Sequence, residues 1–479
     1  MTTAAAALLP YLLAFALALV VSLLLTPAIR DFAIRRRFLD AVGSARKIHT
    51  RSVPRLGGVA IVASWLLAAG SMLVIDPSLR DDLWGSPPRT LLFLVGGVIA
   101  AAVGFVDDLR GLRARYKLAA QLAIGALLCF GGYAVQQIQL PGGAIVSLGP
   151  LGVPFTMLWI AGVMNAMNLI DGLDGLAAGV AGIALCTVFV SALWLGKPVL
   201  ALHSAALIGA LLGFLFYNFN PASIFMGDAG SLFLGYFLAF ALLRTTQRSP
   251  TNAVEIAVPL LVMGLPIADT ALAVLRRVVR GQGLFSPDRD HLHHRLLARG
   301  LTQRRAVVLL YAVCGLLAVG GTAMVWGGQH VDRWIVIALV AAAAAALYRL
   351  KPLRSTLASL SRERRRNQDL RMAITSISER FKCAGSVADV LGAFDGLIVA
   401  VAASQVKAQI GTTLAEHGLS ECGASALRLH FPVHEGTRRL GNVEIAWDDG
   451  RAAADANHVL AVEEVCENAA RALRRVPAP

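Results

Sequence analysis

Carboxylate and amide side chains gather in three short stretches of the sequence, each next to a long apolar run. They are the pair Asp107-Asp108, the repeat Asn165, Asn168, Asp171 and Asp174, and Asp228 in the segment Phe-Met-Gly-Asp-Ala-Gly-Ser. A spacing of three residues predicts that Asn168, Asp171 and Asp174 lie along one side wherever the repeat is helical. Carboxylate and amide oxygens are the ligands that hard cations such as Mg²⁺ prefer. The glycine-flanked Asp228 predicts a turn at a helix start that faces a metal or a phosphate.

Each acidic stretch also has a plainer interpretation. Asp107 and Asp108 are adjacent, so on a helix they point about 100° apart and need not share one ligand. The alternative for them is a solvated pair at a helix end. Residues 171–175, Asp-Gly-Leu-Asp-Gly, are also typical of a turn or a calcium-like loop, although the full EF-hand pattern is absent.

Two basic groups accompany the acids. The later one consists of His291, His293, His294 and Arg295, with Arg289 and Arg299 on either side. Zinc is an alternative ligand, but no cysteine accompanies them and the arginines repel a cation. A diphosphate suits them better, since Arg offers a bidentate fork and His a donor or a cation. A solvated basic loop is the remaining alternative.

The earlier basic group lies in the first connection between apolar runs. It contains Lys47, His49, Arg51 and Arg55, followed by Gly57-Gly58. We interpret it as a basic patch followed by a flexible hinge. The alternative is the ordinary positive charge of a cytoplasmic membrane loop.

These polar stretches interrupt a chain that is otherwise apolar. Of its 479 residues, 56% are hydrophobic and only 15% are charged, and the mean hydropathy is +0.64. A soluble domain carries about a quarter charged residues, and apolar runs of about 17–25 residues match a membrane-crossing helix. We therefore expect an all-α polytopic membrane domain, residues 1–350, with about eleven transmembrane helices. The expected spans are about 5–28, 56–75, 90–106, 118–134, 152–167, 176–195, 200–217, 231–243, 253–275, 306–326 and 333–348.

Lys and Arg are concentrated in alternate connections between these spans. The first, third and ninth connections are rich in them, and the connections between these are poor. The positive-inside rule then places the N-terminus outside and the C-terminal tail in the cytoplasm. All five polar stretches fall on cytoplasmic connections. The formal net charge of +14 is explained by this topology and by anionic headgroups and phosphate, so it does not indicate nucleic acid.

Acids that bind Mg²⁺, opposite basic groups that bind phosphate, predict phosphoryl transfer, which depends on positioning and charge neutralisation. A Walker A loop, a dinucleotide glycine fingerprint and a Ser-His-Asp order are all absent from the sequence. In order and topology, the five stretches resemble the polyprenyl-phosphate N-acetylhexosamine-1-phosphate transferase superfamily (glycosyltransferase family 4), over about residues 10–345.

The resemblance implies roles for single residues. Asn168 and Asp228 would hold Mg²⁺ (or Mn²⁺), Asp107 would face the lipid phosphate as base or orienting group, and Asp108 would lie near the metal. Asn165 belongs to the substrate side, Asp171 and Asp174 to the nucleotide side, and Phe225 would stack on uracil. The phosphates and sugar would contact His291, His293, His294 and Arg295, and Lys47 falls near the substrate position of one branch.

The order His-Leu-His-His-Arg is similar to the GlcNAc-1-phosphate branch rather than to the phospho-MurNAc-pentapeptide translocases, which remain the alternative. The implied reaction moves GlcNAc-1-phosphate from UDP-GlcNAc to undecaprenyl phosphate and releases UMP, by direct attack or by double displacement through an Asp. Such enzymes begin cell-wall or O-antigen lipopolysaccharide synthesis at the bacterial inner membrane. A secondary transporter is the alternative from another class, although we find no internal repeat. A homo-oligomer is left open.

The composition changes after Leu350. Residues 351–479 begin with a charged run that favours a helix, and Leu427–Trp447 alternates apolar and polar residues as a β-hairpin does. A helical stretch at 452–475 follows. We expect a small cytoplasmic α+β domain, faintly similar to the end of a GAF fold. Its role is either regulation through an unknown partner or structural support.

Overall fold

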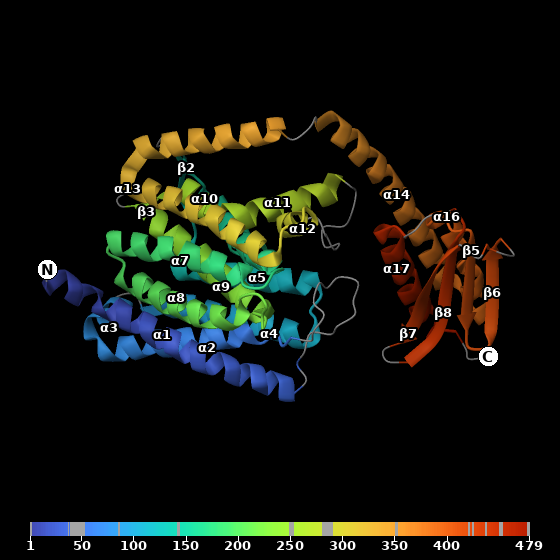
Figure 1. Ribbon diagram of the computed structural model, residues 1–479, viewed down its shortest axis with the longest axis horizontal. Coiled ribbons are helices and arrows are strands. Elements are labelled where there is room, and N and C mark those ends of the chain that lie inside the picture. Colours follow the sequence, from blue (N-terminus) through green and yellow to red (C-terminus); the bar gives the residue numbers. More distant parts are fainter. Residues whose placement is uncertain are drawn as a thin grey trace. The chain divides into compact units, whose positions relative to one another are not determined.

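The computed structural model describes residues 2–36, 38, 53–84, 87–140, 144–248, 253–279, 291–349, 353–419, 422–423, 426–435, 438–449 and 454–476. The chain divides into two compact units (Figure 1). One contains residues 1–274 and 287–349, and the other contains residues 350–479 with the short segment 275–286.

Helices dominate the chain before residue 350. They are α1 (Thr2–Arg35), α2 (Gly57–Ile75), α3 (Pro77–Trp84), α4 (Pro87–Arg110), α5 (Ala114–Leu128), the π-helical turn η1 (Cys129–Tyr133), the 3₁₀ turn η2 (Gly149–Leu151), α6 (Gly152–Ile170), α7 (Leu176–Trp194), α8 (Pro198–Asn218), α9 (Gly227–Thr246), α10 (Ala257–Val262), α11 (Gly264–Val279), α12 (Leu292–Ala298) and α13 (Gln303–Arg349). In the described residues, eight helices are long and apolar enough to cross a membrane: Ala7–Arg35, Gly57–Ile75, Leu91–Arg110, Gly149–Ile170, Leu176–Trp194, Pro198–Asn218, Gly227–Thr246 and Gln303–Trp326.

The expected count of eleven spans is not confirmed, for local reasons. Around 118–134 the α-helical segment is short, because Gly132 adopts a φ of +78° and the chain leaves the helix. The run 253–275 is divided at Met263, between α10 and α11, and Pro266 lies in the first turn of α11, where its missing N–H is tolerated. The run 333–348 is assigned to the same element, α13, as the span before it.

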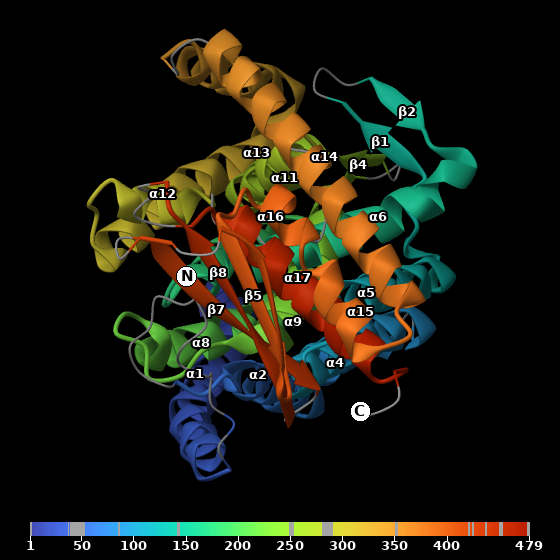
Figure 2. The same cartoon turned by 90° about the vertical axis from the view of Figure 1, so that its right-hand side faces the viewer.

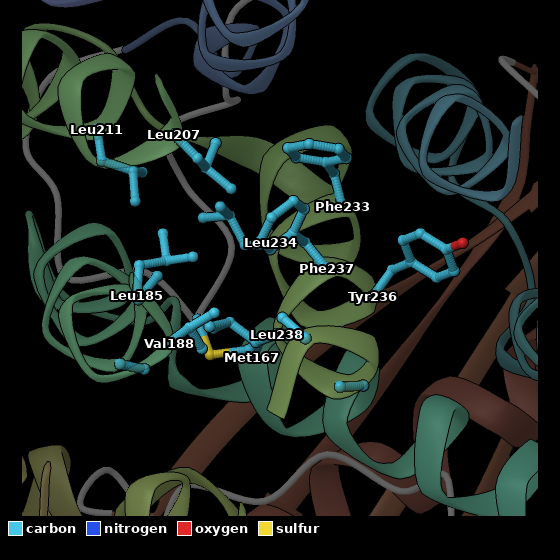
Figure 3. Packing of buried hydrophobic residues seen from close by; sticks show 14 of the residues in the cluster. Met167, Leu185, Val188, Leu207, Leu211, Phe233, Leu234, Tyr236, Phe237 and Leu238 are labelled. Atoms are coloured by element: carbon cyan, nitrogen blue, oxygen red, sulfur yellow. The ribbon is translucent and has the colours of Figure 1, made fainter. Parts of the chain in front are cut away.

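Helix α9 forms the centre of the bundle. Its apolar window is 94% buried, and it packs against α2, α4, α6 and α7. Figure 3 shows its Phe233, Leu234 and Leu238 beside Met167 of α6 and residues of α7 and α8. A helix that is hydrophobic all round has to be enclosed by others. The enclosed α9 therefore fixes the positions of the residues at its two ends, Asp228 and Arg244.

A small sheet lies in this predominantly helical unit, which corrects the expectation that it is all-α. It consists of β1 (Gln137–Gln139), β2 (Ile145–Ser147), β3 (Gln247–Arg248) and β4 (Ala253–Glu255), in the order β2-β1-β4-β3. Figure 2 shows β1 and β2 side by side. Strands of two or three residues are too short to show an alternating pattern, so the sequence gives no signal for them.

The second unit is α+β. It contains α14 (Leu353–Cys383), α15 (Val387–Ala393), α16 (Gly396–Ala400), β5 (Gln405–Ile410), β6 (Thr413–Gly418), β7 (Leu427–Glu435), β8 (Arg438–Trp447) and α17 (Ala456–Leu473). The strands form an antiparallel sheet in the order β6-β5-β8-β7. The predicted hairpin and final helix are thus confirmed, and a capping box of Ser386 and Asp389 begins α15.

Candidate functional site

Asp108 and Gly227 together determine how α9 begins. Asp108, near the end of α4, accepts hydrogen bonds from the main-chain N–H of Asp228 (2.8 Å) and of Ala229 (3.0 Å). A carboxylate is favoured there, because a helix N-terminus carries unpaired N–H groups and a partial positive charge. Gly227 has a φ of +73°, and an added Cβ would lie 2.1 Å from the carbonyl oxygen of Arg55 and 2.6 Å from Asp108 Oδ2. Only glycine fits this position without displacement.

Lys117 links the two carboxylates next to this helix start. Its ammonium group, in the first turn of α5, contacts both Asp107 and Asp228. Burial lowers the pKa of Lys117. The carboxylates of Asp228 and Asp107 raise it by more than burial lowers it, so the pKa ends above its ordinary value. The lysine therefore stays charged. In the sequence, Lys117 is only one of the positive charges of a cytoplasmic connection, and its position ten residues after Asp107 carries no recognisable spacing signal.

The asparagines of the repeat have different neighbours. The amide of Asn168 donates to Asp228 Oδ1 (2.9 Å) and to Ser231 Oγ (3.0 Å). Asn165, one turn earlier on α6, donates instead to Gln121 Oε1 of α5 (2.6 Å) and to the carbonyl of Ala161. The structure thus brings Asn168 to the carboxylates and places Asn165 in a contact between two helices.

The two aspartates of the repeat also separate, because α6 ends at Ile170. The pKa of half-buried Asp171 is raised to about 8, by burial first and then by the charges of Asp228 and Asp108. Asp174 is 5% exposed and accepts hydrogen bonds from Asn220 Nδ2 (2.9 Å) and from the N–H of Ala222 (3.1 Å). The idea of one shared helix side therefore does not extend beyond Asn168, and Asp174 holds the loop before α9.

Phe225 joins that loop to the segment before α2. Its N–H donates to the carbonyl of Pro54 (2.8 Å), and its carbonyl accepts from Gly57 N–H (2.9 Å). A Cβ on Gly58 would lie 2.1 Å from the nitrogen of Gly230. The glycine pair is therefore a point of close helix packing, which corrects its interpretation as a flexible hinge.

Of the first basic group, Arg55 is the member that the structure describes beside the acids. Its charge acts on Asp108 and Asp171. Lys47, the substrate residue expected from the resemblance, lies outside the described residues, as do His49 and Arg51.

The histidine group begins at α12. His291 Nδ1 lies 2.9 Å from Asp269 Oδ2, and Asp269 Oδ1 accepts from the N–H of Leu292 (2.9 Å). Asp269 was missed by sequence analysis, although a single acid within an apolar run is a signal of function. The ring of His293 is 5.7 Å from that of His291 and 4.3 Å from that of His294.

His293 connects this group to the acidic repeat. A Cβ on Gly172 would lie only 2.6 Å from His293 Nε2, so the two stretches meet. Burial, and then the neighbouring His294 and His291, lower the pKa of His293 to about 4. This imidazole is neutral near pH 7 and serves as a hydrogen-bonding group rather than a cation. Arg295 is exposed.

The assembled site has more acids than bases. Asp107, Asp108, Asp171 and Asp228 lie with Lys117 and Arg55. Among the residues that the structure describes, no group of three or more His, Cys, Asp or Glu is arranged as a metal site. The excess of acidic side chains in this site is suited to bind a cation together with an anionic ligand that supplies the remaining coordinating oxygens.

Comparison with known proteins adds an independent finding. Residues 90–246, which contain all three acidic stretches, match the sequence model of a family described as glycosyl transferase family 4. Over 331 residues, or 68% of this chain and 88% of the relative, the chain is 37% identical to a Bacillus subtilis protein named probable undecaprenyl-phosphate N-acetylglucosaminyl 1-phosphate transferase.

Two further relatives have similar names. A decaprenyl-phosphate N-acetylglucosaminephosphotransferase of Mycolicibacterium smegmatis is 35% identical over 59% of this chain and 74% of its own length. An undecaprenyl-phosphate alpha-N-acetylglucosaminyl 1-phosphate transferase of Escherichia coli K12 is 27% identical over 61% of this chain and 78% of its own length.

Proposed function

Since the chain belongs to glycosyl transferase family 4, in the branch of the undecaprenyl-phosphate GlcNAc-1-phosphate transferases, we propose that it transfers a sugar 1-phosphate from a UDP-sugar to a polyprenyl phosphate. The proposed donor is UDP-GlcNAc or a related UDP-N-acetylhexosamine, and the released product is UMP. The names of the relatives support the acceptor and the sugar. A cell-envelope polysaccharide pathway is the proposed destination of the product.

The observation that carries the proposal is the contact of Lys117 with both Asp107 and Asp228, next to Asn168. Phosphoryl transfer needs positioned charge rather than a strong nucleophile. This group offers a fixed cation and fixed acids within one hydrogen-bonded set. A secondary transporter would need neither this set of contacts nor membership of a family of phosphotransferases.

In the proposed step, an oxygen of the lipid phosphate attacks the β-phosphorus that carries the sugar. A new P–O bond forms, the bond from that phosphorus to the bridging oxygen breaks, and UMP leaves with the bridging oxygen. A phosphate monoester has a second pKa near 6, so the nucleophile arrives largely deprotonated. Asp107, which accepts from Lys117 and from the N–H of Leu112, therefore acts as an orienting group rather than as a strong base.

We propose Mg²⁺ as the cofactor, held by Asp228 and Asn168, where it would neutralise diphosphate charge. The donor set fits, because it consists of oxygens and carries more negative than positive charge. Mg²⁺ commonly binds one or two carboxylates and takes its other ligands from phosphate and water. Neutral His293 would donate to, or accept from, the substrate, and exposed Arg295 would pair with phosphate oxygens.

The charge distribution supports a cytoplasmic site and tail, with the N-terminus outside the bacterial inner membrane. Cysteine labelling from each side of sealed vesicles would test it.

The reaction is tested by UMP release from the full chain with undecaprenyl phosphate, Mg²⁺ and UDP-GlcNAc. We expect release that requires both lipid and metal, and that falls at least about 10³-fold in Asp228→Asn, because a group acting on transition-state charge is lost. Asp81→Asn is the matched control, since the Asp81 side chain is 79% exposed on α3. If folded protein releases no UMP from any UDP-N-acetylhexosamine, the proposal is wrong.

A further inference from the structure

A cavity with polar lining lies at the end of α9 opposite the acidic site. Its volume is about 240 Å³, well above the roughly 30 Å³ that one water occupies in the liquid. Rings of Phe93, Tyr133 and Phe240 form walls, and its polar lining includes Lys197, His203 and Arg244. Within the described part of the chain, no Asp or Glu is among the lining residues. The cavity therefore combines an apolar wall with two cations and an imidazole.

His203 is the deepest polar group of this cavity. It is 3% exposed, and its ring lies 5.4 Å from that of Trp65 and 6.1 Å from that of Phe93. Among the described residues, neither ring nitrogen has a hydrogen-bond partner. An unpaired buried polar group destabilises the folded chain. A ligand that enters the cavity and accepts a hydrogen bond would remove that destabilisation.

The two cations lie close together. Lys197 Nζ donates to the main-chain carbonyl of Arg244, whose guanidinium lies 5.5 Å from the centroid of the Tyr133 ring. Burial, and then the charge of Arg244, lower the pKa of Lys197 to about 8. An anion that contacts both side chains would interact favourably with each of them.

The cavity lies at a membrane boundary. Arg244 follows Asp228 by sixteen residues of α9, which is about 24 Å of helix and close to the roughly 30 Å of a bilayer core. Lys197 is the residue immediately before α8, at the end of the connection from α7. Cations and aromatic rings at this depth meet lipid headgroups, where amphipathic side chains concentrate.

We propose that this cavity binds the phosphate group of an anionic membrane lipid, in the leaflet opposite the transfer site. Lys197 and Arg244 contact the phosphate oxygens, and the N–H of His203 donates to the headgroup. The rings of Phe93 and Phe240 contact the apolar part of the lipid. Free phosphate offers the same oxygens without an apolar part, so the two sources are separable.

The test uses the full chain in detergent and native mass spectrometry, with phosphatidylglycerol, phosphatidylcholine and inorganic phosphate as separate probes. We expect phosphatidylglycerol to bind more tightly than phosphatidylcholine, and Lys197→Gln to weaken phosphatidylglycerol binding roughly fivefold, the effect of one cation near a membrane surface. Arg80→Gln is the matched control, because Arg80 is exposed on α3, which packs against α8 at the same end.

His203→Phe keeps the ring contacts and removes the N–H, so it should also weaken binding, and melting in phosphatidylcholine reports whether it folds. If millimolar inorganic phosphate displaces phosphatidylglycerol, the cavity is a site for free phosphate, and the proposed contacts of Lys197 and Arg244 with phosphate oxygens still hold. Equal phosphatidylglycerol binding by Lys197→Gln, Arg80→Gln and the unchanged chain would overturn the proposal, whatever the result for His203→Phe.

Discussion

Helix α9 connects two charged regions that are constructed differently. At its start, Asp228 is in contact with Lys117 and Asn168, and Asp108 caps the helix. At its end, Lys197 and Arg244 border a cavity in which His203 has no hydrogen-bond partner among the described residues. Groups at the start are held by one another before any ligand arrives, as catalysis by fixed charges requires. Groups at the end surround space, as binding requires.

After Asp228→Asn, the largest effect should follow from removing the cation at the start of α9. Lys117→Met should reduce UMP release by about 10²–10³-fold, because Asp107 and Asp228 lose the charge that positions them. Lys382→Met is the control, since the side chain of Lys382 is 63% exposed. A loss smaller than about threefold in steady-state assays would show that the start of α9 does not depend on this contact.

Next in size is a comparison of two glycines with left-handed backbone. Gly227 (φ +73°) has Arg55 and Asp108 against it, whereas Gly196 (φ +61°), beside Lys197, has open space within 4 Å. Gly196→Ala should cost only the left-handed strain, about 1–2 kcal/mol. Gly227→Ala should cost that strain and displace the Asp108 cap, so UMP release should fall at least about tenfold. Equal activity of the two variants would contradict the close fit at Gly227.

A smaller effect is expected from the pH dependence of stability. The lowered pKa of His293, about 4, means that the unfolded chain binds the proton first as the pH falls below about 6.5. Folding stability is then lost between about pH 6.5 and pH 4, by about 2 kcal/mol at pH 5. His293→Gln lacks this proton, so its melting temperature should fall less than that of the unchanged chain between pH 7 and pH 5. Parallel curves would show that His293 is not buried as a neutral ring.

The smallest effect concerns the far end of α9. Lys197→Gln should leave UMP release within about twofold, because the cavity lies about 24 Å from the carboxylates and contacts no reacting atom. The initial rate in phosphatidylcholine nanodiscs measures this. A large loss of activity there would join the two regions into one functional unit.

Sequence patterns predicted the parts of the site that carry a residue-type signal. The acids Asp107, Asp108, Asp171 and Asp228, together with Asn168, could be singled out because each interrupts an apolar run. The structure brings them together, and their roles stay predictions. The helix-side argument applies only where the repeat is helical, and because α6 ends at Ile170 it does not reach Asp171 or Asp174.

Other features depend on contacts across long stretches of chain. Lys117 resembles any loop lysine until α4 and α9 bring Asp107 and Asp228 to it. The close approach of Gly58 to Gly230 and the contact of Asp269 with His291 also depend on the tertiary fold, so the sequence does not reveal them. The bundle of helices was predictable from length and hydropathy, but the breaks at Gly132 and Met263 arise from local backbone geometry within runs that remain apolar.

The cap by Asp108 has a consequence for how the chain is made. Its two hydrogen-bond donors, at Asp228 and Ala229, are synthesised 120 and 121 residues later. During insertion, the end of α4 therefore has to stay in contact with water until α9 has entered the bundle. The reaction centre is then completed by one late event, and a nascent chain arrested before residue 227 would carry its first acids without forming an active enzyme.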